Sequence, residues 1–283
     1  MIRTEKFHIS SGRVAKAVLV YLLVILVSAV FAFPCVWLIL SAFNAEGDLL
    51  TLEGFFPKSY SLDTFRRLFT EVNKYDYKRW FGNTLFVAAV SCAISTALVL
   101  AVSYTISRYR FKGRKSIMKA TLLLGIFPNF MNMTALFVLM TQLHLINNLW
   151  GLILLYSSGA AMGFLVQKGF FDTIPSSIYD AAVLDGASDL RVFVSITLPL
   201  SKPMIVYTAL TSFVWPWADF MLPSMLLVDK STWTVAVGLN FLDDSEFSIF
   251  AAGALFVAVP IVALYIALSR YLIQGGSAGA VKE

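Results

Sequence analysis

Long apolar segments separated by short polar ones constrain this chain more than any other feature. Hydrophobic residues make up 58% of its 283 residues and charged residues only 14%, whereas an ordinary soluble domain carries about 25% charged residues. A membrane-spanning helix needs about 20 mostly apolar residues to cross a hydrocarbon core of about 30 Å. The sequence predicts six such spans, at about residues 18–43, 85–106, 117–140, 149–171, 204–228 and 247–273.

Each span is expected to be a helix because backbone groups cannot stay unpaired in lipid. The segments are also too long and too continuously apolar for the alternating strands of a membrane barrel. The predicted fold class is therefore all-α, a polytopic membrane protein with six transmembrane helices in a single domain over residues 1–283.

Positive charge in the short loops predicts the orientation of the spans. Residues 108–119 carry six Lys or Arg and no acid, and the N-terminal arm is also basic, so both are expected on the cytoplasmic side. The 141–148 connection has no Lys or Arg, and the 229–246 loop is mainly acidic, so both are expected outside. By parity the 44–83 loop is outside and the C-terminus is cytoplasmic.

Catalytic motifs are absent from the sequence. It has no HExxH, GxSxG or GxxxxGK[ST] pattern, and its two histidines lie in a tail and a loop. No catalytic residue, metal site or bound cofactor is therefore expected in this chain. Nucleic-acid binding is disfavoured because no binding signature accompanies the basic residues. A secondary transporter remains a remote alternative, since it would need several buried ionisable groups and an internal repeat.

One acid, Asp219, lies about fifteen residues into a predicted span, between Pro216 and Pro223. A carboxylate at such depth must face protein or a water-filled cavity, and the prolines free backbone carbonyls that need partners. Asp219 therefore either belongs to a transport pathway or braces helices near the outer surface. Both interpretations stay open.

The polar segment 172–203 lies between two predicted spans on the cytoplasmic side. Pro175 is expected to begin a short helix that Gly186 terminates, and Ser188 to cap a second helix that stops before Pro199. Two short amphipathic helices can lie on the bilayer surface. However, their polar residues are acidic, where an anionic leaflet favours Lys and Arg, so the pair is better suited to a groove in a soluble protein.

The residues of this segment resemble the EAA coupling motif of ABC importer permeases, EAAxxDGAxxxxxFxxxxLPLxxP. One difference is the leading residue, which is aspartate here in place of glutamate, so docking with adjusted geometry is expected. The resemblance implies that an ATPase-coupling site comprises Asp180, Ala181, Ala182, Asp185, Gly186, Ala187, Phe193, Leu198 and Pro199.

Two further segments are similar to carbohydrate-importer permeases of the maltose type. Trp217 to Phe220 resembles their WNDF sequence, with Ala218 in place of asparagine, and the C-terminal tail resembles GLTAGAVK. The tail implies an ATPase contact through Gly275, Gly279 and Lys282.

The resemblance implies a multi-pass subunit of the bacterial cytoplasmic membrane that forms half of an oligosaccharide channel. Its expected partners are a homologous second permease, an ATPase dimer that binds ATP and magnesium, an extracytoplasmic sugar-binding protein and the lipid bilayer. Another glycan or a polyol phosphate is the alternative cargo. Candidate substrate-path residues, each of which could equally serve helix packing, are Asn129, Asn132, Tyr156, Trp215, Trp217 and Asp219. Candidate contacts to the binding protein, or alternatively an interfacial aromatic belt, are Trp233, Leu239 and Phe241.

Overall fold

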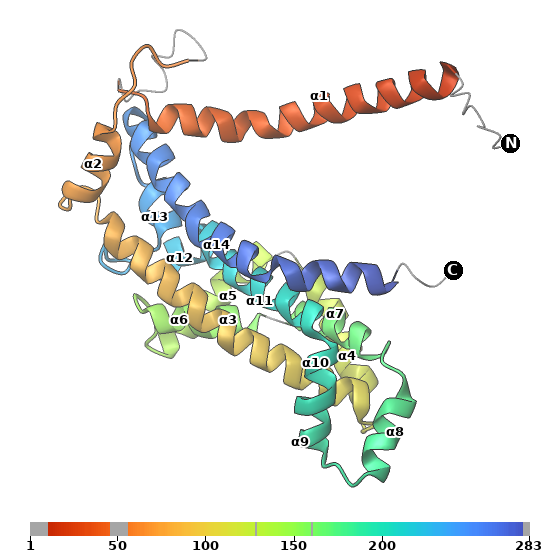
Figure 1. Ribbon diagram of the computed structural model, residues 1–283. Helices are drawn as coiled ribbons and strands as arrows, with labels where there is room; N and C mark the ends of the chain where they lie inside the picture. Colours follow the sequence, from red (N-terminus) through yellow and green to blue (C-terminus); the bar gives the residue numbers. More distant parts are fainter. Residues whose placement is uncertain (1–10, 46–55, 128, 160, 280–283) are drawn as a thin grey trace, which may run out of the picture. The chain divides into compact units, whose positions relative to one another are not determined.

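The computed structural model describes residues 11–45, 56–127, 129–159 and 161–279, and these residues are almost entirely helical (Figure 1). Within them the only β pairing is one antiparallel bridge between Asn44 and Tyr60. The helices are α1 (Ser11–Ala42), α2 (Asp63–Thr70), α3 (Tyr77–Arg108), α4 (Arg114–Ile126), η1 (Asn129–Asn132), α5 (Met133–Gln142), α6 (Leu149–Ser158), α7 (Ala161–Phe171), α8 (Ser176–Leu184), α9 (Asp189–Val192), η2 (Phe193–Thr197), α10 (Leu198–Leu200), α11 (Lys202–Ala218), α12 (Met221–Leu226), α13 (Val235–Asn240), η3 (Asp244–Glu246) and α14 (Phe247–Gly279).

Three of these helices, α1, α3 and α14, are long and apolar enough to cross a membrane, and the number rises to six if each of three bent helix pairs forms one span. The bends are 94° between α4 and α5, 41° between α6 and α7, and 82° at the start of α11. The all-helical, multi-pass fold class predicted from the sequence is confirmed.

Three spans expected to be continuous helices are interrupted, which corrects their predicted course. The 149–171 segment is divided into α6 and α7, which are bent by 41°. The 117–140 segment breaks after Ile126, where Phe127 is extended with φ −73° and ψ 127°. The cause is the following Pro128, because proline disfavours the helical region for the residue before it. The 204–228 segment breaks at Asp219, which is also extended, and a short α12 follows.

The chain consists of two compact units, residues 1–67 with 243–255 and residues 68–242 with 256–283. In the first unit, Trp37 of α1 packs on Phe247 with ring centroids 5.3 Å apart. Phe43 packs on Phe65 of α2 with centroids 5.0 Å apart. Within this unit the apolar stretch of α1 is not buried, as expected for a surface that faces lipid.

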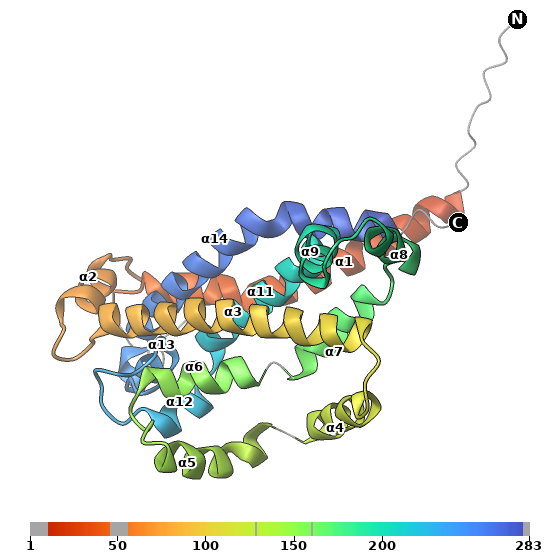
Figure 2. The ribbon, with the colours of Figure 1, turned by 90° about the horizontal axis from the view of Figure 1, so that it is seen from below.

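In the second unit, α3 is the helix on which α6, α7 and α11 pack (Figure 2). Small side chains at intervals of about four residues on α3 form one stripe, because residues i and i+4 share a helix face. These small side chains let the backbones of α6 and α7 come close to α3, and their hydroxyls donate hydrogen bonds to backbone carbonyls of those helices. Ser95 donates to the carbonyl of Tyr156 at 3.4 Å, and Ser103 to that of Phe164 at 3.0 Å.

Candidate coupling loop and aromatic loop

The predicted coupling loop, residues 172–203, contains the helix pair α8 and α9, which Figure 1 shows as a hairpin. Gly186 separates the two helices with φ +76°, a left-handed conformation that glycine adopts without a steric penalty. Ser188 caps α9 by accepting a hydrogen bond from the backbone N–H of Arg191 at 3.4 Å. The two helices, the glycine turn and the serine cap were all predicted from the sequence.

The second helix does not stop before Pro199, contrary to the sequence prediction. It continues through η2, a π-helical turn, into α10, which ends at Leu200. Proline has no N–H, and its ring clashes with the carbonyl four residues earlier in an α-helix. The π-turn over Phe193–Thr197 has hydrogen bonds five residues apart instead of four. This wider spacing accounts for the continuation of the helix past Pro199.

The helix pair has a packed inner side and an exposed apolar outer side. Tyr179, Ala182 and Val192 are buried between the helices. The motif residues divide accordingly, because Ala182 packs internally whereas Asp180, Ala181, Asp185, Gly186 and Pro199 are exposed, and Ala187, Phe193 and Leu198 are half-buried. The exposed apolar residues are Val183, Leu184, Leu190 and Val194. Leu184 is 87% exposed and Leu190 71%, so the pair presents a surface suited to a partner groove.

The C-terminal end of α3 holds both helices of the pair. The Arg108 guanidinium lies over the Tyr179 ring, 3.7 Å from its centroid. Tyr104 packs against Phe193 with centroids 4.7 Å apart, and its hydroxyl donates to the Asp189 carbonyl at 3.4 Å. A cation–π contact contributes up to about 2 kcal/mol when desolvated. Sequence reasoning treated Arg108 only as a topology signal and missed this role.

Two ionisable groups beside this end of α3 have shifted pKa values. A hydrogen bond with the Asp189 carboxylate raises the pKa of Tyr109 to about 12, because the bond requires the protonated hydroxyl. At Asp172, burial acts to raise the pKa, but hydrogen bonds from Lys168 and Ser107 outweigh it and lower the pKa below the ordinary value. Ser107 donates to Asp172 at 2.6 Å, and Lys168 forms an ion pair with it.

Two predicted substrate-path residues, Tyr156 and Asp219, lie together. The Tyr156 hydroxyl donates to one Asp219 oxygen at 3.0 Å, and the other oxygen accepts the backbone N–H of Leu222 at 3.3 Å. These bonds support the bracing interpretation of Asp219, because they tie α6 to the start of α12. A pathway role stays a prediction.

The other predicted path residues are dispersed. Trp217 is 3% exposed and packs against Phe81 with centroids 5.1 Å apart, so it belongs to the helix core. Trp215 is 56% exposed, and Asn132 is exposed at the break between α4 and α5. The side chain of Asn129 lies outside the described residues.

The aromatic loop, residues 227–242, contains the predicted binding-protein contacts. Trp233 and Phe241 are stacked with centroids 5.0 Å apart and an interplanar angle of 23°. Phe241 is 59% exposed, whereas Leu239 is only 5% exposed and supports the loop from inside. At Gly238 an added Cβ would meet the Trp80 ring, so glycine is required for this close packing.

Hydrogen bonds from the N-terminal end of α3 hold the aromatic loop. The Trp80 indole N–H donates to the Lys230 carbonyl at 3.0 Å. Asn83 donates to the carbonyls of Ser231 and Trp233 at 3.0 and 2.9 Å. The hydroxyl of Thr84, one residue further along, accepts the N–H of Val235 at 2.8 Å.

Asn147, between α5 and α6, holds the same loop from another side. Its backbone is left-handed with φ 58°, a conformation that asparagine tolerates better than most residues. Its Oδ1 accepts from the N–H groups of Val228 and Asp229 at 3.1 and 3.0 Å and from the Thr232 hydroxyl at 2.6 Å. Its Nδ2 donates to the Asp229 carboxylate at 2.5 Å. No sequence signal singled out this residue.

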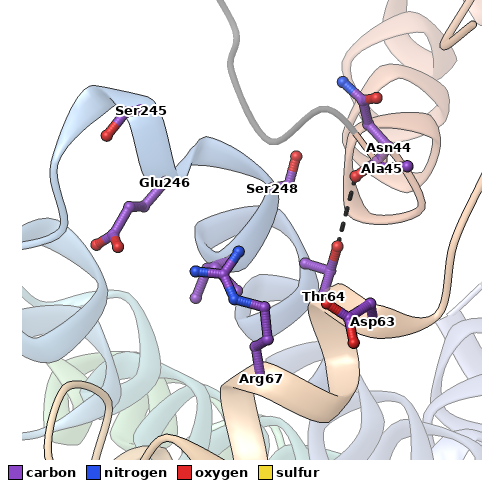
Figure 3. A pocket seen from close by; sticks show the side chains of 9 residues that line it. Asn44, Ala45, Asp63, Thr64, Arg67, Ser245, Glu246 and Ser248 are labelled. Atoms are coloured by element: carbon purple, nitrogen blue, oxygen red, sulfur yellow. Dashed lines mark hydrogen bonds between the residues drawn. The ribbon is translucent and has the colours of Figure 1, made fainter. Parts of the chain in front are cut away.

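A small polar pocket lies in the first unit, where α2 meets η3 and the start of α14 (Figure 3). Thr64 on its wall donates to the Asn44 carbonyl at 3.5 Å. The lining residues are Asn44, Ala45, Asp63, Thr64, Arg67, Ser245, Glu246, Ser248 and Ile249. Among the described residues, no group of three or more His, Cys, Asp or Glu could hold a metal ion.

Of the predicted C-terminal ATPase contacts, Gly275 and Gly279 belong to the last turns of α14. Lys282 lies outside the described residues. This contact stays a prediction.

Comparisons with known proteins agree with this architecture. The family model described as "Binding-protein-dependent transport system inner membrane component" matches residues 93–275. The galactooligosaccharides transport system permease protein GanQ of Bacillus subtilis is 36% identical over 267 residues, which cover 93% of this chain and 94% of GanQ. The maltodextrin transport system permease protein MdxG of the same organism is 36% identical over 278 residues, which cover 96% of this chain and 99% of MdxG.

Solved structures share the fold. A chain of a bacterial ABC transporter involved in the import of the acidic polysaccharide alginate matches with a TM-score of 0.77 at 19% identity, covering 94% of this chain and 99% of that chain. A second alginate transporter structure, in complex with a pentasaccharide-bound periplasmic protein, matches with a TM-score of 0.66 at 17% identity, covering 90% and 94% of the two chains. At these identities the likeness concerns the fold alone.

The family model and the relatives therefore define this helical, multi-pass chain as a membrane transport subunit. More specifically, the chain belongs to the family of binding-protein-dependent ABC transporter permeases. It is a multi-pass component of the inner membrane that depends on a binding protein.

Proposed function

We propose that this chain forms one half of the translocation channel of an oligosaccharide importer, together with a homologous second permease. An ATPase dimer binds ATP and magnesium and drives the cycle, and an extracytoplasmic sugar-binding protein delivers the cargo. The names of GanQ and MdxG, a galactooligosaccharide and a maltodextrin permease, support this cargo class. Their identity to this chain extends over more than nine tenths of its length.

The single observation that carries the proposal is the helix pair of the coupling loop. Its inner side is packed, its turn at Gly186 is fixed in a left-handed conformation, and Leu184 and Leu190 project outward. A packed pair with an exposed apolar side is suited to seat in a groove of the ATPase and move as one body. Closure of the ATPase dimer would then shift the pair and select one of two states of the spans.

The charge pattern supports an orientation in which both termini are cytoplasmic. The basic 108–119 segment follows α3 directly, and the coupling loop packs against the same end of α3 through Tyr104 and Arg108. In this orientation the coupling loop lies on the side where ATP is available. The C-terminal tail, with Gly275, Gly279 and Lys282, is proposed to contact the ATPase as well.

Glycans of another composition and polyol phosphates are the alternative cargoes. Uptake of labelled maltodextrin, galacto-oligosaccharide and a polyol phosphate by cells with and without this chain separates them. We expect loss of oligosaccharide uptake in its absence. Loss of polyol phosphate uptake alone would overturn the cargo proposal and leave the permease family unaffected.

The coupling role is tested by placing a β-branched residue at Gly186. Valine is strained at φ +76°, so Gly186→Val should distort the turn between α8 and α9. Gly113 is a matched control, because it also has positive φ, at +96°, and lies in another loop. ATPase activity of the assembled transporter in lipid nanodiscs is measured with and without maltodextrin-loaded binding protein.

We expect Gly186→Val to abolish stimulation by the binding protein and Gly113→Val to retain it, with both complexes assembled. Equal stimulation in the two variants would show that the helix pair does not transmit ATPase movement.

A further inference from the structure

We propose that α3 is a strut that joins the coupling loop to the aromatic loop, with Arg108 and Tyr104 as positioning residues at one end and Asn83 at the other. The inference rests on the proposed function and adds the element through which movement passes from the ATPase side to the side of the binding protein.

Continuity distinguishes α3 from the segments packed on it. It runs unbroken from Tyr77 to Arg108, and 32 residues at 1.5 Å each give a length of about 48 Å. In contrast, α6 and α7 are bent by 41° at their break, and α11 ends at an extended Asp219 before α12. An unbroken helix passes a displacement along its axis, whereas a broken one absorbs part of it at the break.

The attachments at the C-terminal end reach both helices of the coupling pair. Arg108 covers the ring of Tyr179, which is 1% exposed and directly precedes the acidic Asp180 of the motif. Tyr104, one turn earlier on the same face, contacts Phe193 and the Asp189 carbonyl. Contacts with two helices at once prevent the pair from rotating independently of α3.

The attachments at the N-terminal end fix the backbone of the aromatic loop directly. Asn83 bonds the carbonyls on both sides of Thr232, those of Ser231 and Trp233, and the latter residue stacks on the exposed Phe241. A displacement of α3 along its axis therefore moves this loop without any intervening flexible element.

Neighbouring basic residues show that Arg108 does more than set the topology. Arg110 lies two residues further, is exposed, and has no ring contact among the described residues. If positive charge alone were needed, Arg108 and Arg110 would be equivalent. Only Arg108 covers the buried ring, so the two arginines form a matched pair for an experiment.

The experiment measures the ratio of stimulated to basal ATPase activity of the complete transporter in nanodiscs, with maltodextrin-loaded binding protein. Arg108→Ala and Tyr179→Leu should each lower the ratio at least about fivefold, the lower end of ordinary coupling between sites. Arg110→Ala, which keeps the contact, and Tyr179→Phe, which keeps the ring, should remain near the native ratio. Equal ratios for Arg108→Ala and Arg110→Ala, or equal loss in Tyr179→Leu and Tyr179→Phe, would overturn the proposal.

A double-mutant cycle between the two ends tests the strut itself. Arg108→Ala and Asn83→Ala are combined, and their effects on the ratio are compared with those of the single variants. If both residues act through α3, the ratio should be lowered in the double variant little more than in the more severely affected single variant. Multiplying effects would show that the ends act independently and would reject the strut.

Two results separate this inference from the proposed function. If the native transporter shows no stimulation by the binding protein, the proposed function itself fails. If the native transporter is stimulated and Arg108→Ala is too, only the strut fails. Should Arg108→Ala not assemble, the pair Tyr179→Leu and Tyr179→Phe decides the result.

Discussion

The two loops at the ends of α3 are held by different kinds of interaction. At the aromatic loop, Asn147, Asn83 and Trp80 donate or accept hydrogen bonds directly with the loop backbone. At the coupling loop, Tyr104 and Arg108 mainly contact aromatic rings of the helix pair. The N-terminal end of α3 fixes the backbone conformation of the aromatic loop, whereas its C-terminal end packs against side chains on the surface of the helix pair.

The difference follows from what each loop contains. Between Leu226 and Val235 the aromatic loop has no helix, so its N–H and C=O groups need partners from elsewhere in the chain. The coupling loop satisfies most of its backbone within its own helices and needs only side-chain packing to be held. A segment of irregular backbone is therefore fixed residue by residue, and a helical segment can be moved as a body.

The largest effect is expected from Gly238→Ala in the aromatic loop. The added methyl group would meet the ring of Trp80, which is 2% exposed and itself bonded to the Lys230 carbonyl. Overpacking typically costs about 1–3 kcal/mol and occasionally more, and we expect the upper end here because the added Cβ would lie less than 3.0 Å from a ring carbon. We expect a lower thermal midpoint of the purified complex and loss of binding-protein stimulation.

Gly82→Ala is the matched control, because Gly82 lies in α3 close to Trp80 and an added Cβ would meet no atom within 4 Å. It should be neutral or slightly stabilising, since alanine is a better helix former than glycine. Similar melting of the two variants would mean that the contact between Gly238 and Trp80 is not tight.

A smaller effect is expected from Asn147, and two variants separate its side chain from its backbone. Asn147→Gly removes the side-chain bonds to Val228, Asp229 and Thr232 but retains the left-handed backbone. Asn147→Ala removes the bonds and also strains the backbone. The Asn147 side chain makes four hydrogen bonds, three of them exposed to solvent. At about 0.5 kcal/mol each, the lower end for a net hydrogen bond, the glycine variant should lose about 2 kcal/mol, and the alanine variant somewhat more.

Protection of the 227–242 amides in hydrogen exchange measures this directly. Both variants should exchange faster in these residues, and the coupling loop should be unchanged. Equal exchange in the native and glycine variants would show that the Asn147 side chain does not hold the loop.

The smallest effect is expected at Asp172, on the coupling side. Its pKa is lowered in the folded chain, so its bonds to Ser107 and Lys168 stabilise the fold above the unfolded pKa near 3.8. That contribution is lost as the pH falls through the lowered folded value, because the unfolded chain then binds the proton more readily. Asp172→Asn should therefore flatten the fall in thermal midpoint below about pH 4. An unchanged pH profile would contradict this assignment.

Local features were predictable from the sequence because local interactions decide them. The spans follow from uninterrupted apolar runs, the end of α8 from Gly186, and the start of α9 from the hydroxyl of Ser188. The break after Ile126 had a visible cause in Pro128, but its effect on a long apolar run was underestimated. The continuation past Pro199 depends on a π-turn, which has no simple sequence signature.

The contacts that hold the loops could not be predicted, because they join residues far apart in the chain. Arg108 meets Tyr179, and Asn147 meets Asp229, only after the helices have packed. Single-residue properties do not identify such pairs. From the sequence alone, an arginine in a basic loop is explained by membrane topology, and an asparagine in a polar turn is explained by the turn itself.

The bend between α4 and α5 has a consequence for how the cell must produce this protein. Apolar side chains around that break are largely exposed in the single chain, among them Leu123 at 61%, Leu124 at 66% and Ile126 at 76%. Extended backbone within a membrane also needs protein around it, because lipid offers no hydrogen bonds. In the proposed importer a partner subunit would stabilise the folded chain by mass action, so we expect copies made in excess of the second permease to be short-lived.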